Sequence, residues 1–222
     1  MVNKRASLVV LISGSGSNLQ AIIKAVNNGD INADINAVIS NRAGVKGLQI
    51  AEQAGIKTFT LDHTNYSSRE NFDLALIECI DQFSPSLVIL AGFMRILSDV
   101  FIHHYAEHLI NIHPSLLPKF KGLNTHERAL NAGDSIHGAS VHMVNAELDS
   151  GEIVIQAEVD IKPDDNKESL AERVLMQEHK IYPLAISLFV DGTLCFKQHV
   201  LQFKNKPLLQ PLLWTSNKLI TP

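Results

Sequence analysis

The sequence predicts an α/β fold with a mostly parallel sheet and helices on both of its faces. Strand-like apolar runs alternate with helix-like segments through the first half of the 222-residue chain, and this β-α-β order requires parallel strands joined by right-handed crossovers. Residues 86–92 (SLVILAG) are almost continuously apolar, which is typical of a strand covered on both faces. After residue 113 the pattern changes, and a more antiparallel C-terminal part is expected.

The elements of the first half follow from hydrophobic spacing. Strands are expected at residues 7–12, 35–40, 57–61, 86–92 and 109–113. The first helix has apolar residues at i, i+3, i+4 and i+7, namely Leu19, Ile22, Ile23 and Val26. Gly29 can end this helix, and the next helix is expected to end near Gly55. Ser67 and Glu70 form a possible capping box for a third helix.

The second half predicts a strand pair and a long helix. Residues 139–144 and 153–161 flank the turn-rich segment NAELDSG, which suggests a hairpin or a looped strand pair. A helix is expected from about Glu168, with Pro183 producing a kink or a break. We interpret residues 1–222 as one domain, with halves at about 1–105 and 106–200 and a tail at 201–222 that no pattern assigns.

Composition limits the possible classes of function. The chain is 45% hydrophobic, enough for a sizeable core, and its 19 Lys and Arg against 23 Asp and Glu give a net charge of −4. No stretch concentrates cations, so no nucleic-acid partner is expected. Cys79 and Cys195 are far apart and indicate neither a disulfide framework nor a zinc site. The apolar stretch at 6–12 fits a first strand better than a signal peptide, and no segment has transmembrane length. We therefore expect a cytoplasmic protein without a membrane partner.

The histidine-rich segment HHYAEH is not interpreted as a metal site. His103, His104 and His108 are expected on one helix, with His104 and His108 at i, i+4 spacing. The segment does not match H-E-x-x-H, because Glu107 is misplaced, and no third ligand is evident. We expect a partly solvated helix face and no bound metal.

The segment SGSGSN, residues 13–18, lies between the first strand and the first helix. Backbone N–H groups and the helix dipole offer an anion site there. Leu19 occupies the place of the third glycine of a dinucleotide fingerprint, and the lysine of a P-loop is lacking. A single phosphate is therefore the predicted ligand, and the alternative is a tight turn without a ligand.

Asn111 and His113 form the strongest catalytic candidate. Residues i and i+2 of a strand share a face, and Pro114 marks the strand end, where parallel sheets bind ligands. An amide can hydrogen-bond a developing oxyanion while an imidazole moves a proton. Asp149 lies in a loop that can return to this strand end and orient the ring. The alternative is a structural histidine with satisfied hydrogen bonds.

Four segments together resemble the glycinamide ribonucleotide (phosphoribosylglycinamide) formyltransferases, which are folate-dependent enzymes of purine synthesis. These segments are SGSGSNLQAII, LAGFMRIL, NIHPSLLPKFKG and HGASVHMVNAELDSG. The likeness runs from Leu8 to about Gly192 and keeps the motif order. It implies a Rossmann-like mononucleotide-binding fold, 10-formyltetrahydrofolate as formyl donor and glycinamide ribonucleotide as acceptor. The implied chemistry is formyl transfer through a tetrahedral intermediate in de novo purine (IMP) biosynthesis, without a metal.

The resemblance also implies roles for residues of this chain. The catalytic trio is Asn111, His113 and Asp149, in which the charge of Asp149 favours a protonated His113. The residues implied at the ribonucleotide, mainly its phosphate, are Gly16, Ser17, Asn18 and Glu178. Those implied at the folate are Arg69, Met94, Arg95, Ile96, Leu97, Asn111, Asn145, Ala146, Glu147 and Leu148. The sequence departs from the family pattern at Ser15, Lys121 and Leu175.

Other functions remain open at this point. Methionyl-tRNA formyltransferase and formyltetrahydrofolate hydrolase share the trio, but the first usually adds a C-terminal RNA-binding domain and the second an N-terminal regulatory domain. A non-catalytic nucleotide-binding module on the same fold is an alternative from another class. That module gives no reason for Asn111, His113 and Asp149 to occur together.

Overall fold

The computed structural model describes residues 5–216 and 218–221. The chain divides into two compact units, of which Asn111 ends the first and Ile112 begins the second. The expectation of one domain with halves near residue 105 stays a prediction.

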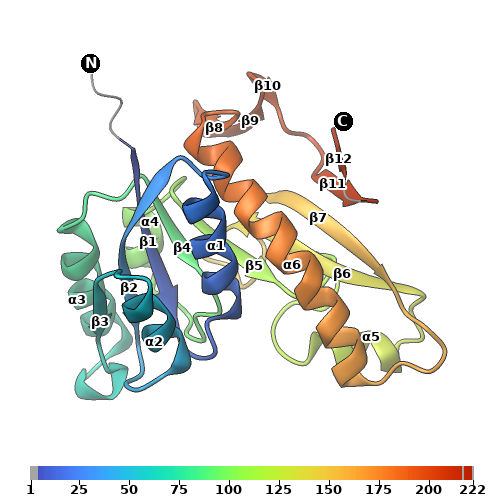
Figure 1. Cartoon of the computed structure of the whole chain (residues 1–222), viewed down its shortest axis with the longest axis horizontal. Helices are drawn as coiled ribbons and strands as arrows, with labels where there is room; N and C mark the ends of the chain where they lie inside the picture. Colours follow the sequence, from blue (N-terminus) through green and yellow to red (C-terminus); the bar gives the residue numbers. More distant parts are fainter. Residues whose placement is uncertain (1–4, 217, 222) are drawn as a thin grey trace. The chain divides into compact units, whose positions relative to one another are not determined.

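The first unit alternates strands and helices as the sequence predicts (Figure 1). In chain order its elements are β1 (Ala6–Ile12), α1 (Ser17–Asn28), β2 (Ala33–Ser40), α2 (Lys46–Gln53), β3 (Thr58–Thr60), the 3₁₀ turn η1 (His63–Asn65), α3 (Arg69–Asp81), β4 (Leu87–Leu90), α4 (Asp99–His104) and β5 (Leu109–His113). The last two residues of β5 belong to the second unit.

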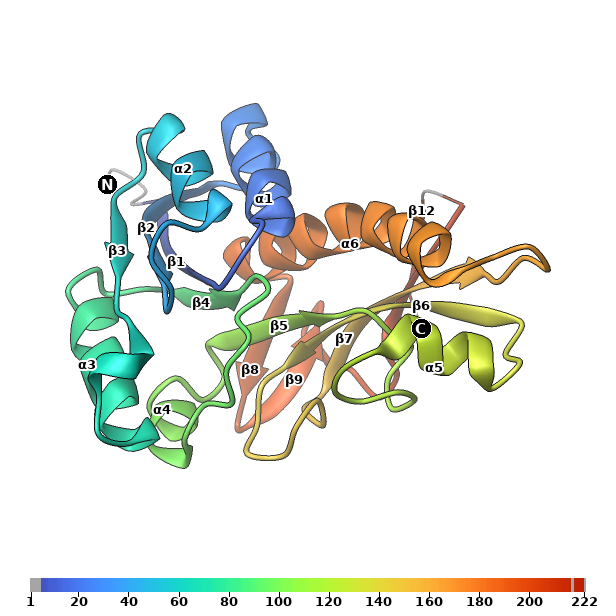
Figure 2. The ribbon, with the colours of Figure 1, turned by 90° about the horizontal axis from the view of Figure 1, so that it is seen from below.

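The sheet of this unit is parallel. Its strand order is β3-β2-β1-β4-β5, and each neighbouring pair is parallel. Helices α1 and α2 lie on one face, and α3 and α4 lie on the other (Figure 2). Strand β4 is buried along its whole length, which confirms the prediction made from its continuous apolar run.

The helix ends of the first unit agree with the sequence in two cases and correct it in two. Helix α2 ends at Gln53, near the predicted Gly55. Helix α1 ends at Gly29, whose φ of 82° is left-handed, as predicted. The capping box of Ser67 and Glu70 is wrong by one residue, because Ser68 is the cap and accepts the Asn71 N–H at 3.1 Å. Helix α4 ends at His104, so His108 does not share its face. His108 instead contacts the Ser86 carbonyl at 3.2 Å.

The second unit contains the predicted strand pair and a long helix. After β5 its elements are α5 (Thr125–Asn131), β6 (Ile136–Met143), β7 (Ile153–Asp160), α6 (Lys167–Val190), β8 (Leu194–Lys197), β9 (Val200–Phe203), β10 (Lys206–Pro207), β11 (Leu212–Thr215) and β12 (Lys218–Ile220). Strands β6 and β7 are antiparallel, which confirms the predicted strand pair, and residues 144–152 form the loop between them. Helix α6 packs on both of these strands (Figure 1).

Of the two effects predicted for Pro183, helix α6 overturns the break, and the kink stays a prediction. The helix continues through the proline instead of breaking there. Proline removes one helical hydrogen bond, but Ile181, Tyr182 and Ala185 around it are fully buried. Their burial offsets the lost bond, because fully burying a large apolar side chain stabilises by about 1.5–3 kcal/mol.

The tail that the sequence left unassigned forms strands. Strand β9 pairs with β8 and β10 in a separate antiparallel sheet. Strand β11 adds to β7 in parallel, and β12 pairs with β11 in antiparallel fashion. The expected antiparallel character of the C-terminal part is therefore confirmed within this unit.

Candidate active site

Strand β5 places the amide and imidazole candidates two residues apart. Asn111 is half-buried, and His113 is 6% exposed. The strand is followed at once by Pro114, which cannot donate a ladder hydrogen bond. The polar pair therefore stands at the carboxyl end of a parallel strand, where sheets of this type bind ligands.

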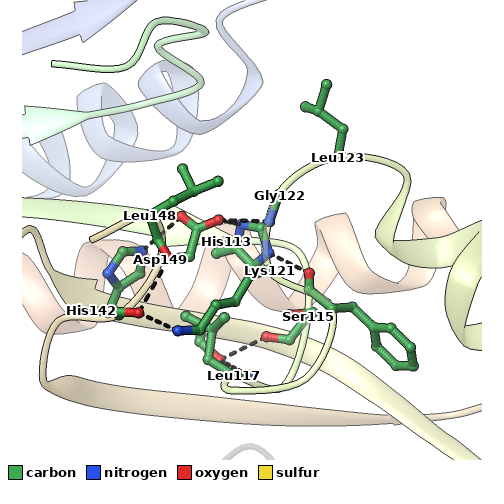
Figure 3. A network of polar contacts seen from close by, with 12 residues as sticks. His113, Ser115, Leu117, Lys121, Gly122, Leu123, His142, Leu148 and Asp149 are labelled. Atoms are coloured by element: carbon green, nitrogen blue, oxygen red, sulfur yellow. Dashed lines mark hydrogen bonds and ion pairs between the residues drawn. The ribbon is translucent and has the colours of Figure 1, made fainter. Parts of the chain in front are cut away.

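The Asp149 carboxylate lies beside His113, as the sequence analysis required of it. Its Oδ2 atom is 3.4 Å from His113 Nδ1 and accepts the Gly122 N–H at 2.9 Å. Its Oδ1 atom is 3.7 Å from His142 Nε2. Figure 3 shows the carboxylate between the two imidazoles. Partners on three other segments thus fix the carboxylate, and it does more than cap its own turn.

Both nitrogens of His113 face acceptors. Nδ1 meets the Asp149 carboxylate at 3.4 Å, and Nε2 is 3.0 Å from the Phe120 carbonyl oxygen. A carbonyl and a carboxylate can only accept, whereas a doubly protonated imidazole donates from both nitrogens. These two contacts fix the orientation of the His113 ring.

His142 is a neighbour that the sequence analysis did not single out. Its Nδ1 atom is 2.7 Å from the Met143 carbonyl oxygen, to which it donates. Burial lowers the pKa of His142 and outweighs the Met143 hydrogen bond and the Asp149 charge, which act in the opposite direction. The sequence feature that could have indicated His142 is its place near the end of β6, just before the loop that carries Asp149.

The loop of Asp149 is held close to β6 by its backbone. Asp149 has a φ of 48°, in the left-handed region. At Gly151 an added Cβ would lie 1.9 Å from the Met143 carbonyl oxygen, so only glycine permits this approach. The strained backbone at Asp149 is typical of a functional position held by its surroundings.

The segment after β5 is fixed to the β6–β7 pair by hydroxyl and amide groups. Ser140 Oγ donates to the Ser115 carbonyl at 2.7 Å and accepts the Leu117 N–H at 3.0 Å. The Gln156 amide donates to the Leu117 carbonyl at 2.9 Å. Lys121, one of the departures from the family pattern, donates to Ser150 Oγ. These bonds hold the backbone that presents Gly122 to Asp149.

His126 and His137 form a second histidine contact in this unit, 3.2 Å apart. His137 is fully buried. Burial, followed by the charge of His126, lowers the pKa of His137 to about 4, and burial also lowers the pKa of His126. Both rings are therefore neutral near pH 7 and provide no permanent charge.

We expect His137 to make the fold less stable in acid. Between pH 6.5 and about 4 the unfolded histidine binds a proton that the folded one does not, so the free energy of unfolding falls as the pH falls through this window. Urea unfolding at pH 7 and at pH 5 measures this change. The free energy of unfolding should fall more between these two pH values in the wild type than in His137→Gln. Equal losses in the two proteins would contradict this assignment.

The glycine loop of the first unit is closely packed against α2. Gly16 has a φ of 74°, and a Cβ placed there would lie 2.6 Å from the Gly47 Cα. The Gly47 N–H donates to the Gly14 carbonyl at 3.0 Å. These contacts explain the glycines as a tight turn without any ligand. The phosphate role of Gly16, Ser17 and Asn18 therefore stays a prediction.

The two loop glycines should differ in their tolerance of a methyl group. Gly16→Ala should lower the melting temperature by several degrees, because the Cβ meets the backbone at Gly47 and L-residues strain at this φ. Gly14→Ala is the matched control, since nothing lies within 4 Å of its added Cβ. Equal melting temperatures for the two variants would show that the loop yields without cost.

The remaining candidates divide between the two units. In the first unit Arg69 begins α3, with its side chain 47% exposed and its Nε 3.8 Å from the Glu70 carboxylate. Met94 and Ile96 are more than half exposed, whereas Leu97 is buried. In the second unit the predicted residues are Asn145, Ala146, Glu147 and Leu148 in the Asp149 loop, and the buried Glu178 on α6. Their roles toward substrates stay predictions.

Two features are absent from the part of the chain that the structure describes. Residues 5–216 and 218–221 contain no helix long and apolar enough to cross a membrane. The same residues contain no group of three or more His, Cys, Asp or Glu arranged to hold a metal ion. In the HHYAEH segment, His104 instead pairs with Asp81 at 2.9 Å.

An amide and an imidazole at a strand end, with a buried carboxylate beside the imidazole, suit acyl-type transfer. Comparison with known proteins identifies the family of transferases to which the chain belongs. Residues 6–186 match the family model described as formyl transferase, and the chain belongs to this family.

Individual relatives of this chain within the family are named as follows. Phosphoribosylglycinamide formyltransferase of Escherichia coli (strain K12) is 54% identical over 188 residues, which cover 85% of this chain and 89% of that protein. The trifunctional purine biosynthetic protein adenosine-3 of Homo sapiens is 47% identical over 190 residues, 86% of this chain but 19% of that protein. The solved structure of the Coxiella burnetii phosphoribosylglycinamide formyltransferase is 49% identical with a TM-score of 0.88, and the match covers 92% of this chain and 96% of that one.

Proposed function

We propose that this protein transfers the formyl group of 10-formyltetrahydrofolate to the amine of glycinamide ribonucleotide, a step of de novo purine biosynthesis. The supporting comparison is the Escherichia coli phosphoribosylglycinamide formyltransferase, which is 54% identical and matched along 89% of its length. The observation that carries the chemistry is the buried contact between His113 and Asp149 at the end of β5. The formyl donor is a cosubstrate, and no metal is invoked.

The residues of β5 have distinct parts in this reaction. The substrate amine attacks the formyl carbon, a new C–N bond forms, and the carbonyl oxygen becomes an oxyanion. The Asn111 amide stabilises this oxyanion by donating a hydrogen bond, and His113 Nε2 exchanges its contact with the Phe120 carbonyl oxygen for one with the oxyanion. The Asp149 carboxylate, 3.4 Å from Nδ1, orients the His113 ring and faces the positive charge that the ring carries during proton transfer.

Collapse of the tetrahedral intermediate completes the transfer. The bond between the formyl carbon and the folate nitrogen breaks, and the proton lost by the attacking amine passes to that nitrogen through His113 or a held water. His113 thus acts as the general acid and base. Atoms balance, since one C–N bond replaces another and one proton changes nitrogen.

The substrate contacts extend this proposal to the binding residues. Gly16, Ser17 and Asn18 bind the ribonucleotide phosphate at the start of α1, where N–H groups converge, and Glu178 lies near the ribonucleotide. Folate contacts are made by Arg69, by residues 94–97 and by the loop at 145–149. The exposed Met94 and Ile96 suit an apolar ring system. A cytoplasmic location without nucleic-acid or membrane partners completes the proposal.

The decisive assay follows absorbance as the folate donor is consumed, with and without glycinamide ribonucleotide. The proposal predicts consumption only when the amine is present. Consumption without the amine would indicate a formyltetrahydrofolate hydrolase instead. Binding of either ligand without turnover would favour a nucleotide-binding module.

Arg69 provides a test of the folate assignment. Arg69→Ala should raise KM for the folate donor by roughly 10-fold, as for a lost charged hydrogen bond, and leave KM for the ribonucleotide unchanged. Glu70→Gln is the matched control, because it removes the carboxylate that lies 3.8 Å from Arg69 Nε. Steady-state kinetics with each substrate varied in turn give both constants. A rise in the ribonucleotide KM alone would move Arg69 to the other ligand.

A further inference from the structure

Residues Met94–Ser98 of the first unit have little regular structure of their own and are held by side chains from elsewhere. The Met94 N–H donates to Ser13 Oγ at 2.8 Å. The Arg95 guanidinium stacks 4.6 Å from the centre of the Phe72 ring. The Ser98 N–H donates to the buried Asp73 carboxylate at 2.6 Å. Three points of support therefore fix a segment that otherwise is free to adopt many conformations.

Two of these three supports lead back to one residue, His63. Ser13 Oγ donates at 2.6 Å to the side-chain oxygen of Asn41. His63 Nδ1 is 3.0 Å from the backbone carbonyl of Asn41. A carbonyl only accepts, so this contact at 3.0 Å assigns the proton to Nδ1, and the Asn41 side-chain nitrogen lies farther from Nδ1, at 3.5 Å. Both Ser13 and Asn41 are buried, so the hydrogen bond between these two side chains is shielded from water.

The second connection runs through aromatic rings. The His63 ring meets the Phe72 ring edge to face, with centroids 6.4 Å apart and planes at 83°. Phe72 is fully buried and supports Arg95. His63 therefore reaches Met94 through Asn41 and Ser13, and it reaches Arg95 through Phe72. Its own side chain is 29% exposed.

We propose that His63 is a positioning residue that sets the affinity for the folate donor through the Met94–Ser98 segment. It lies in η1, outside every motif that carries the family resemblance, and it acts on Met94 and Arg95 from two sides. This inference rests on the proposed function, because it takes residues 94–97 as part of the folate site. His63 has no part in the chemical step.

Three variants separate the two connections. His63→Ala removes both of them. His63→Asn keeps an amide donor for the Asn41 carbonyl and loses the ring, whereas His63→Phe keeps the ring against Phe72 and loses the donor. The matched control is His104→Ala, which removes another partly exposed histidine of the same unit from its contact with Asp81.

The measured quantities are both KM values, kcat and the melting temperature. His63→Ala should raise KM for 10-formyltetrahydrofolate by about 5-fold, the usual effect of one lost hydrogen bond. KM for the ribonucleotide and kcat should stay within about 2-fold. His63→Asn and His63→Phe should each recover part of the loss, and His104→Ala should leave both KM values unchanged.

Several results would overturn this inference. One is an unchanged KM for the folate donor in His63→Ala. Another is a parallel rise in both KM values of that variant, as expected of a generally loosened protein. If His63→Ala does not fold, a normal donor KM in both conservative variants has the same meaning. Wild-type protein without amine-dependent turnover would defeat the proposed function, whereas an active wild type with unaffected His63 variants would defeat this inference alone.

Discussion

Asp149→Asn should lower kcat by roughly 10²–10⁴, the range for lost proton-transfer catalysis. The substitution removes the negative charge that faces His113, so positive charge on the imidazole is stabilised less during proton transfer. Substrate binding should largely remain, because the size of the side chain is kept. The measurement is kcat from amine-dependent donor consumption, with donor binding followed separately.

Asp149→Asn is expected to preserve the local structure around residue 149. Asparagine tolerates the left-handed φ of 48° found at Asp149, and its amide oxygen can still accept the Gly122 N–H. The matched control is Asp134→Asn, which removes a carboxylate of the same unit that pairs with Lys119 at 2.8 Å. Its kcat should stay within about 3-fold of the wild type, as for a surface pair. An unchanged kcat in Asp149→Asn would show that Asp149 serves only to form its turn.

Asn111→Ala should lower kcat by roughly 10²–10³, the usual cost of one oxyanion donor. The amide is lost while His113 and Asp149 keep their contact in the second unit. Asn111→Asp, which has the same shape but offers a negative charge to the oxyanion, should be at least as impaired. Equilibrium binding of the folate donor to each variant shows whether the site is still formed. Near-normal turnover of Asn111→Ala would exclude it as the donor.

The sequence predicted those features of the fold that depend on local periodicity. The parallel strands, the helices on both faces and the β6–β7 pair follow from apolar spacing, and Gly29 ends α1 because of its own left-handed φ. Errors arose where tertiary packing decides the outcome. Helix α6 continues through Pro183 because the surrounding residues are buried. The tail strands form by pairing with β7, with β8 and with one another.

The candidate site was predictable in its residue types but not in its contacts. Asn111 and His113 were brought together by strand alternation, which is a local property. The contacts of Asp149 with Gly122 and His142 depend on how two loops fold against β6. The connection from His63 to Met94 crosses three segments of the first unit. No periodicity in the chain reports such contacts.

The central claim is that His113 and Asp149 act as one catalytic unit, and a double-variant cycle tests it most directly. The proteins are wild type, His113→Ala, Asp149→Asn and the double variant, each assayed for amine-dependent consumption of 10-formyltetrahydrofolate. Residues that act together are strongly non-additive. We predict that the kcat of the double variant will be within about 3-fold of that of the worse single variant. Losses that multiply would show that the two residues act independently and would contradict the account.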